Sequence, residues 1–81
     1  MDAVPEGWVV VCTNDDVPRI IGRITTIIGE SGVNIANMTL GRDELGGRAL
    51  TLINLDAPLS PETLKQIRAV PHVNEVRQVQ L

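Results

Sequence analysis

Residues 14–37, NDDVPRIIGRITTIIGESGVNIAN, decide the fold because they contain the end of one strand, a complete helix and the start of the next strand. Pro18 suits the first position of a helix, where its missing N–H costs nothing, and Asp15 or Asp16 can cap the free amides. Gly32 supplies the left-handed residue that ends the helix. The apolar residues have the spacing of a helix that lies on a sheet: Ile20, Ile21, Ile24, Ile27 and Ile28.

Three further segments have the pattern of strands. Residues 8–13, WVVVCT, predict a first strand that is apolar on both faces. Residues 34–42 alternate between apolar and polar positions, and residues 48–55 return after DELGG, which predicts a hairpin. Residues 73–81 predict the last strand, and because its apolar phase shifts after Val76 we expect a bulge or an edge position there.

A second helix is predicted from Ser60 onward. Ser60 suits the N-cap, Pro61 the first helical position, and Glu62 faces the positive end of the helix dipole. Pro71 ends this helix, because proline disfavours helical geometry in the residue before it.

The order strand–helix–strand–strand–helix–strand predicts an α+β fold of the ferredoxin-like type. Such a sandwich has a four-stranded antiparallel sheet with both helices on one face. We expect residues 1–6 to be an N-terminal extension or linker and residues 7–81 to be the domain. Because the first strand is apolar on both faces, the second face or an edge of the sheet should be covered by another protein surface.

The composition predicts a small acidic domain without export or membrane signals. The chain has 81 residues, of which 43% are hydrophobic, and this indicates one globular domain. No apolar run approaches the roughly 20 residues of a membrane span, and the N-terminus lacks secretory features, so we expect a soluble cytoplasmic protein. The net charge of -3 and the single aromatic residue, Trp8, oppose binding to nucleic acid.

Residue sets for catalysis or metal binding are missing from the sequence. Cys12 is the only cysteine, which excludes an internal disulfide, and we expect it to be buried in the first strand. His72 stands alone in a turn, and no Ser, His and Asp set suggests nucleophilic catalysis. Asp43 and Glu44 lack ligand spacing and are interpreted as solvated loop residues. We therefore expect no enzymatic activity, no cofactor and no metal.

Asp16, Arg19 and Asn34 suggest a binding site. We expect the loop 14–19 and Asn34 to face a common spot beside the helix N-terminus, where the first strand ends and the second begins. The carboxylate of an amino acid could bind free helix amides there, its ammonium could bind Asp16, and the Asn34 amide could donate and accept. The alternative interpretation is capping by Asp16 and local backbone bonding by Asn34.

From about Gly7 to its end, the chain resembles an ACT domain. The most similar members are the C-terminal regulatory domains of D-3-phosphoglycerate dehydrogenases, and the ACT domain of L-serine dehydratase is a close second. The resemblance rests on DVPRIIGRITTIIGESGVNIANMTLGR, which is similar to the family's D-x-P-G start of the first helix followed by G-V-N-I-A. It also rests on GGRALTLINLD, which is similar to the third strand of the family.

This resemblance implies a regulatory domain that pairs side by side into one extended sheet and binds a small amino acid such as serine where two copies meet. It implies a homodimer and an attached catalytic domain or subunit, such as phosphoglycerate dehydrogenase in serine biosynthesis. A structural dimerisation domain without effector binding is the alternative. The implied effector-binding residues are Asn14, Asp16, Val17, Pro18, Arg19, Asn34 and Ile35.

Arg19 departs from the family pattern, which usually has glycine after the proline. A glycine there would let the backbone approach a ligand closely. Arg19 could instead clamp the ligand carboxylate, occupy the pocket or point to solvent.

Overall fold

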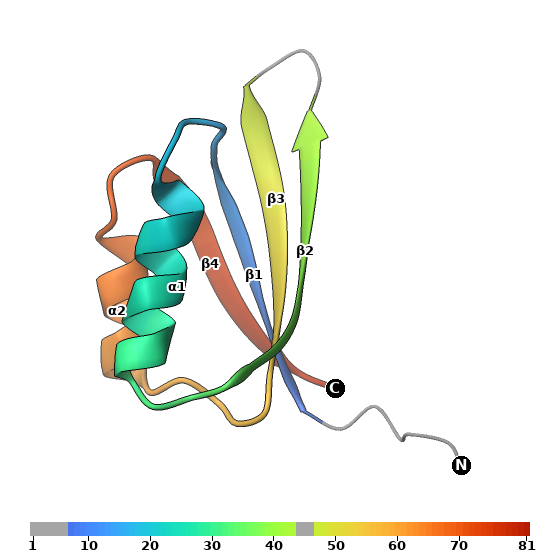
Figure 1. Cartoon of the computed structure of the whole chain (residues 1–81), viewed down its shortest axis with the longest axis vertical. Coiled ribbons are helices and arrows are strands. Elements are labelled where there is room, and N and C mark those ends of the chain that lie inside the picture. The colour runs from blue at the N-terminus through green and yellow to red at the C-terminus, as the bar shows by residue number, and fades with distance from the viewer. Residues whose placement is uncertain (1–6, 44–46) are drawn as a thin grey trace.

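The computed structural model describes residues 7–43 and 47–81, which form a four-stranded antiparallel sheet with two helices beside it (Figure 1). This arrangement confirms the ferredoxin-like fold. The elements are β1 (Trp8–Asp15), α1 (Ile20–Glu30), β2 (Ile35–Asp43), β3 (Arg48–Leu55), α2 (Pro61–Arg68) and β4 (Val73–Gln80).

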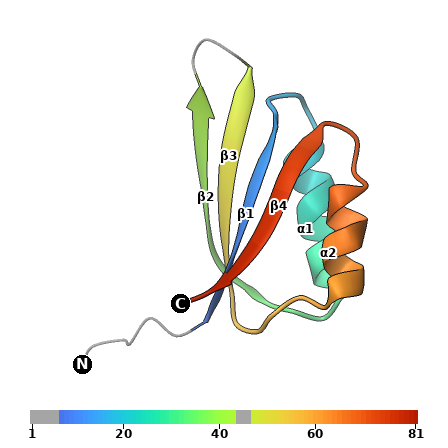
Figure 2. The ribbon, with the colours of Figure 1, turned by 180° about the vertical axis from the view of Figure 1, so that it is seen from behind.

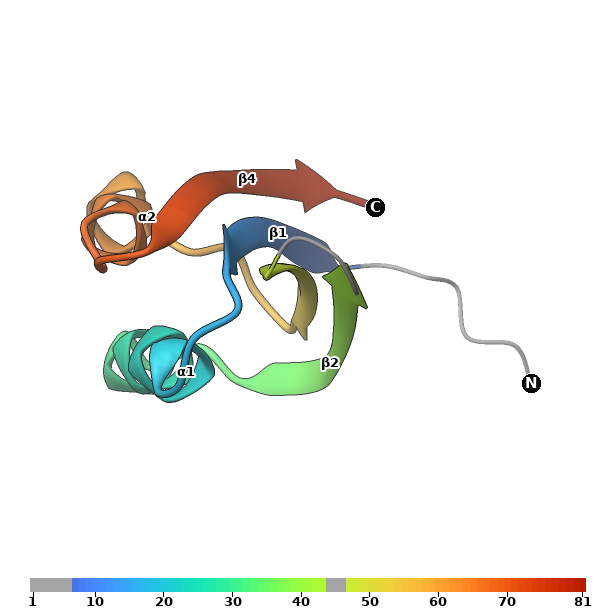
Figure 3. The same cartoon turned by 90° about the horizontal axis from the view of Figure 1, so that it is seen from above.

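The strand order in the sheet is β2-β3-β1-β4, so β1 and β3 are central and β2 and β4 are the edges. The view from behind shows these strands side by side in that order (Figure 2). From above, both helices lie on the same side of the sheet (Figure 3). Neither described helix is long and apolar enough to cross a bilayer.

The core lies between the helices and one face of the sheet. Ile20, Ile24 and Ile28 of α1 are buried in a cluster with residues of the sheet and of α2, while Ile21 and Ile27 of the predicted stripe are half-buried. Cys12 is fully buried in this core, as expected, and burial raises the pKa of its thiol to about 11. The thiol is therefore neutral and serves as a small apolar side chain.

The two helices begin differently. Ser60 accepts a hydrogen bond from the Thr63 amide at 3.1 Å, and Pro61 is the first residue of α2, which confirms the predicted cap. The prediction for α1 was wrong, because its N-cap is Arg19 and no side chain caps it. Pro18 consequently lies outside the helix. The carboxylate of Asp15 contacts His72 and that of Asp16 contacts Arg42, so neither caps α1. The predicted left-handed stop at Gly32 is confirmed by its φ of 85°.

The expected phase shift in the last strand reflects an edge position. Val76 is buried and Val79 is 47% exposed, while Gln78 bonds the backbone amide and carbonyl of Leu59 at 2.8 and 3.2 Å. The only register irregularity described between β1 and β4 lies at Thr13/Asn14, so the bulge is not after Val76. Residues 44–46 of the predicted DELGG turn, and the predicted extension 1–6, lie outside the described residues.

Candidate functional site

The loop between β1 and α1 is held by backbone hydrogen bonds on both sides. The Asp16 amide donates to the Gly47 carbonyl at 2.6 Å, just before β3 begins. The Asp15 amide donates to the His72 carbonyl at 2.8 Å, just before β4 begins. The loop therefore keeps a fixed position at this end of the sheet, and the side chains on it are positioned with it.

Asn14 lies at the base of this loop with an unpaired acceptor. Its side chain is only 2% exposed, and its Nδ2 donates to the Asp15 carbonyl at 2.8 Å. No donor among the described residues reaches its Oδ1. Leaving a buried polar atom without a partner costs about 1–3 kcal/mol, so such an atom calls for an explanation.

A second unpaired oxygen lies nearby, on the neighbouring central strand. The hydroxyl of Thr51 is fully buried and also lacks a partner among the described residues. Thr51 lies opposite Cys12, and Asn14 lies opposite Ala49, so the two polar side chains are diagonal neighbours on the helix-facing side. The helix-facing side of the sheet therefore contains two buried polar side chains at positions where the alternating pattern of a strand favours apolar ones.

Asp16 faces the edge strand β2. Its Oδ2 lies 3.1 Å from Nε of Arg42, near the end of β2. Because both side chains are partly exposed, this ion pair contributes little to stability and can rearrange. Arg42 was not anticipated as a partner, although an arginine near the end of the predicted strand was a usable signal.

The N-terminus of α1 begins directly after this loop. The helix has 11 residues, and its N-cap is Arg19, whose φ of 77° is left-handed. No side chain accepts a hydrogen bond from its first amides. Free amides at a helix N-terminus favour anionic groups. One end of the domain thus combines a carboxylate, a buried amide oxygen and an uncapped helix.

Asn34 and Ile35 lie at the other end of the sheet, which corrects the expectation that they adjoin the loop within one chain. Ile35 is opposite Leu55, and Leu55 is opposite Trp8, the first residue of β1. An eight-residue strand spans roughly 25 Å, so Asp16 and Asn34 are separated by about that length. The expectation treated β1 and β2 as neighbours, whereas β3 lies between them. The Asn34 Nδ2 instead donates to Asp56 Oδ2 at 3.0 Å.

Val17, Pro18 and Arg19 are exposed and line a cavity of about 320 Å³ together with Arg23 and His72. The structure therefore groups Arg19 with residues of α1 and of the turn before β4. His72 is an exposed turn residue, as predicted from the sequence.

The contact between His72 and Asp15 was missed by sequence reasoning, because no pattern links two residues so far apart in the chain. Nδ1 of His72 lies 3.1 Å from Oδ2 of Asp15. Hydrogen bonds from His72 and, to a smaller extent, Asn74 hold the pKa of the Asp15 carboxyl below its usual value. Within residues 7–43 and 47–81, no three His, Cys, Asp or Glu side chains are grouped so that they could hold a metal ion.

Residues 8–72 match the model of the ACT domain family, and the chain belongs to this family. It is similar to the D-3-phosphoglycerate dehydrogenase of Methanocaldococcus jannaschii, with 36% identity over 96% of the chain. It is 33% identical to that of Bacillus subtilis over the whole chain. In both cases the chain spans only 15% of the length of the relative.

Two solved structures share the fold at low sequence identity. The ACT domain of a GTP pyrophosphokinase from Chlorobium tepidum superposes with a TM-score of 0.72 and 15% identity, covering 91% of this chain and 99% of that one. A formyltetrahydrofolate deformylase from Pseudomonas syringae gives a TM-score of 0.78 and 15% identity, covering 93% of this chain and 27% of that one. These two structures support the fold alone.

Proposed function

We propose that the chain is a regulatory module that binds a small amino acid, serine or a similar one, between two copies and so controls an attached or partner enzyme. Its relatives are phosphoglycerate dehydrogenases, and we propose that enzyme of serine biosynthesis as the one controlled. In this proposal catalysis belongs to another domain. The observation that carries the proposal is the unpaired, buried Oδ1 of Asn14 beside Asp16 and the uncapped N-terminus of α1.

An amino acid matches the groups at this end of the sheet. Its carboxylate would accept hydrogen bonds from the free amides of α1. Its ammonium would pair with Asp16 in place of Arg42, since the exposed ion pair rearranges at small cost. Oδ1 of Asn14 would accept from the ammonium or, for serine, from the hydroxyl.

The exposed edge strand β2 offers a surface on which a second copy of the chain could pair. Met38 and Leu40 are 40% and 46% exposed, although their cross-strand partners Ile53 and Thr51 are fully buried. They lie on the helix-facing side of the sheet at an unpaired edge. An edge strand with exposed apolar side chains favours pairing with another strand, and a second β2 would extend the sheet.

Antiparallel pairing of two β2 strands would also complete the site. In a two-fold pair the start of β2 in one copy lies beside the end of β2 in the other. Asn34 of the second copy would then lie near Arg42, which holds Asp16 in the first copy. Two copies would thus bring Asp16 and Asn34 close together, which one copy alone does not do. A ligand that contacts both copies would bias how rigidly they are joined, and through this the attached enzyme.

Calorimetry on the dimeric chain tests the proposal, with serine first and then glycine and the other amino acids. We expect saturable binding of serine or a similar amino acid, lost in Asn14→Leu, which removes the buried acceptor and keeps a similar volume. Thr51→Val is the matched control, because it removes the other unpaired oxygen and should keep binding. If a confirmed dimer shows no heat with any amino acid up to about 10 mM, the sensing role is wrong. That outcome would favour a structural dimerisation domain.

The location of the protein is a separate part of the proposal. We propose the cytoplasm, on the grounds of the sequence features alone.

A further inference from the structure

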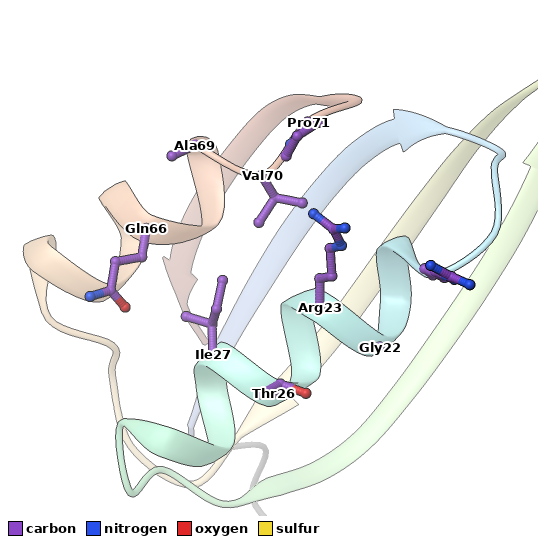
Figure 4. Close-up of a pocket in the computed structure, with 9 residues that line it drawn as sticks. Gly22, Arg23, Thr26, Ile27, Gln66, Ala69, Val70 and Pro71 are labelled. Carbon is purple, nitrogen blue, oxygen red and sulfur yellow. The ribbon is translucent and has the colours of Figure 1, made fainter.

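Two cavities adjoin on the side of α1 that faces α2. A groove of about 710 Å³ runs between the helices and is lined in part by Ile27, Gln66 and Val70. At its end near the β1–α1 loop is the cavity of about 320 Å³, called here the Arg19–His72 cavity. Arg19 and Arg23 line both. In Figure 4, Arg23 points from α1 toward Val70 and Pro71, which follow α2.

The ionisable side chains that line the Arg19–His72 cavity are all basic. Arg19, Arg23 and His72 line it, and no acidic residue does so in the part of the chain that the structure describes. The ion pairs of the described residues are Arg42 with Asp16 and His72 with Asp15, so neither Arg19 nor Arg23 has a carboxylate within 4.0 Å there. In a chain with a net charge of -3, two adjacent arginines without a counter-charge indicate a place for an anion.

The backbone at this cavity is strained on two sides. Arg19 and His72 have φ values of 77° and 76°, and they are the two non-glycine residues with positive φ among those described. For a residue with a side chain, this conformation costs roughly 1–2 kcal/mol, and glycine would adopt it freely. Both residues line the same cavity. Strain of this kind gathers at binding sites, where the side chain is needed in spite of its cost.

His72 is held in place from outside the cavity. Its Nδ1 lies 3.1 Å from the Asp15 carboxylate, and no contact is described for Nε2 in the part of the chain that is placed. When a carboxylate orients one ring nitrogen of a histidine, the other remains available to a ligand. Asp15 thus orients the ring. Because Nδ1 faces the carboxylate, Nε2 is left for a ligand, as an acceptor in the neutral ring and as a donor when the imidazole is protonated.

We propose that the Arg19–His72 cavity binds a small anion that carries a phosphate or carboxylate group. The walls of the cavity are otherwise largely apolar, with Val17, Pro18 and Pro71, which strengthens charge-assisted hydrogen bonds to an anion. Its volume lies at the small end of ligand sites and suits a metabolite of a few carbon atoms. This cavity adjoins the proposed amino-acid site at the N-terminus of α1, but the two extend in different directions: Asp16 faces β2, whereas the cavity extends to the turn before β4.

Titration with inorganic phosphate and, in parallel, with acetate tests this proposal, followed by amide NMR of the full chain at low ionic strength. We expect saturable shifts of the amides of Arg19, Ile20, Arg23 and His72 with at least one of the two anions. Arg19→Gly and His72→Gly remove the basic side chains at positions where glycine suits the backbone. Both variants should therefore fold at least as well as the parent and bind the anion at least about tenfold more weakly.

Arg77→Gln is the matched control, because it removes an exposed positive charge on β4 that does not line the cavity. It should leave the affinity unchanged. Shifts that grow linearly with both anions, or an equal weakening in Arg77→Gln, would overturn the proposal in favour of general charge attraction. Asn14→Leu should keep anion binding while it loses the amino acid, so failure of one site does not imply failure of the other.

Discussion

Arg19 and His72 share a left-handed backbone conformation and line one cavity, although one precedes α1 and the other precedes β4. Each conformation is fixed by a backbone hydrogen bond. The Arg19 carbonyl accepts from the Arg23 amide at 3.0 Å, and the His72 carbonyl accepts from the Asp15 amide at 2.8 Å. The start of α1 and the attachment of β1 to the turn before β4 both depend on these strained residues.

Arg19→Gly should stabilise the domain, because glycine adopts the positive φ without strain. We expect the free energy of unfolding to rise by about 1 kcal/mol, measured by urea denaturation. Arg23→Gly, four residues later inside α1, is the control and should lower it by about 1 kcal/mol. A loss of stability in Arg19→Gly would show that the arginine side chain makes a contact more valuable than the strain it imposes.

The contact between Asp15 and His72 should be visible in the titration of Asp15. Hydrogen bonds from His72 lower the pKa of this carboxyl below 3.8 in the folded state. As the pH falls, the folded state therefore takes up the proton at a lower pH than the unfolded chain does. The stabilisation is therefore full above pH 3.8 and is lost as the pH falls through the lowered pKa. Carboxyl-carbon NMR should show the Asp15 midpoint moving up toward 3.8 in His72→Gly. An unchanged midpoint would exclude His72 as the cause.

The sequence predicted every strand and helix because each carries a local signal. The isoleucine spacing predicted α1, and Ser60 with Pro61 predicted the start of α2. The start of α1 was mispredicted because a non-glycine residue rarely adopts positive φ, so nothing in the sequence marks Arg19 as an N-cap. The predicted Pro18 helix start was the ordinary choice for a proline in that position.

The site was predicted only in part, because strand order is a property of the assembled sheet. Asn14, Asp16 and Arg19 were placed on one loop from the sequence; the structure has Asp16 and Arg19 there, whereas Asn14 belongs to the end of β1. To predict which residues lie near Asn34, one must know that β3 lies between β1 and β2 in the sheet. The periodicity of the sequence does not reveal this strand order. The contacts of Asp15 with His72 and of Asp16 with Arg42 likewise join residues distant in the chain.

Ile24→Ala should strongly destabilise the domain. Ile24 is fully buried between α1 and the sheet, and such truncations cost about 2–5 kcal/mol through lost burial and the cavity left behind. That is a large fraction of the stability of so small a domain. Ile21→Ala, at a half-buried position of the same helix, is the control and should cost less in urea denaturation. Equal losses would mean that the core is not centred on Ile24.

Leu40→Lys should dissociate the proposed dimer. Leu40 is 46% exposed on the unpaired edge strand β2, so a lysine there should hardly affect the folded monomer but should weaken pairing of two edges. Val79→Lys is matched to it, since Val79 is 47% exposed on the opposite edge strand β4. Light scattering over a concentration series should show a monomer only for the Leu40 variant. Dissociation by Val79→Lys alone would move the interface to the other edge.

The central claim, that two copies share the amino-acid site, is tested most directly by mixing two inactive variants. Asp16→Ala and Asn34→Ala should each abolish serine binding, since each homodimer lacks one contact in both sites. A heterodimer of the two contains one site with both residues intact and one site with neither. After equal mixing and exchange of subunits, random pairing predicts about a quarter of the parent's serine-binding capacity by calorimetry. Absence of any recovered binding, with heterodimers shown to be present, would contradict a site built from both copies.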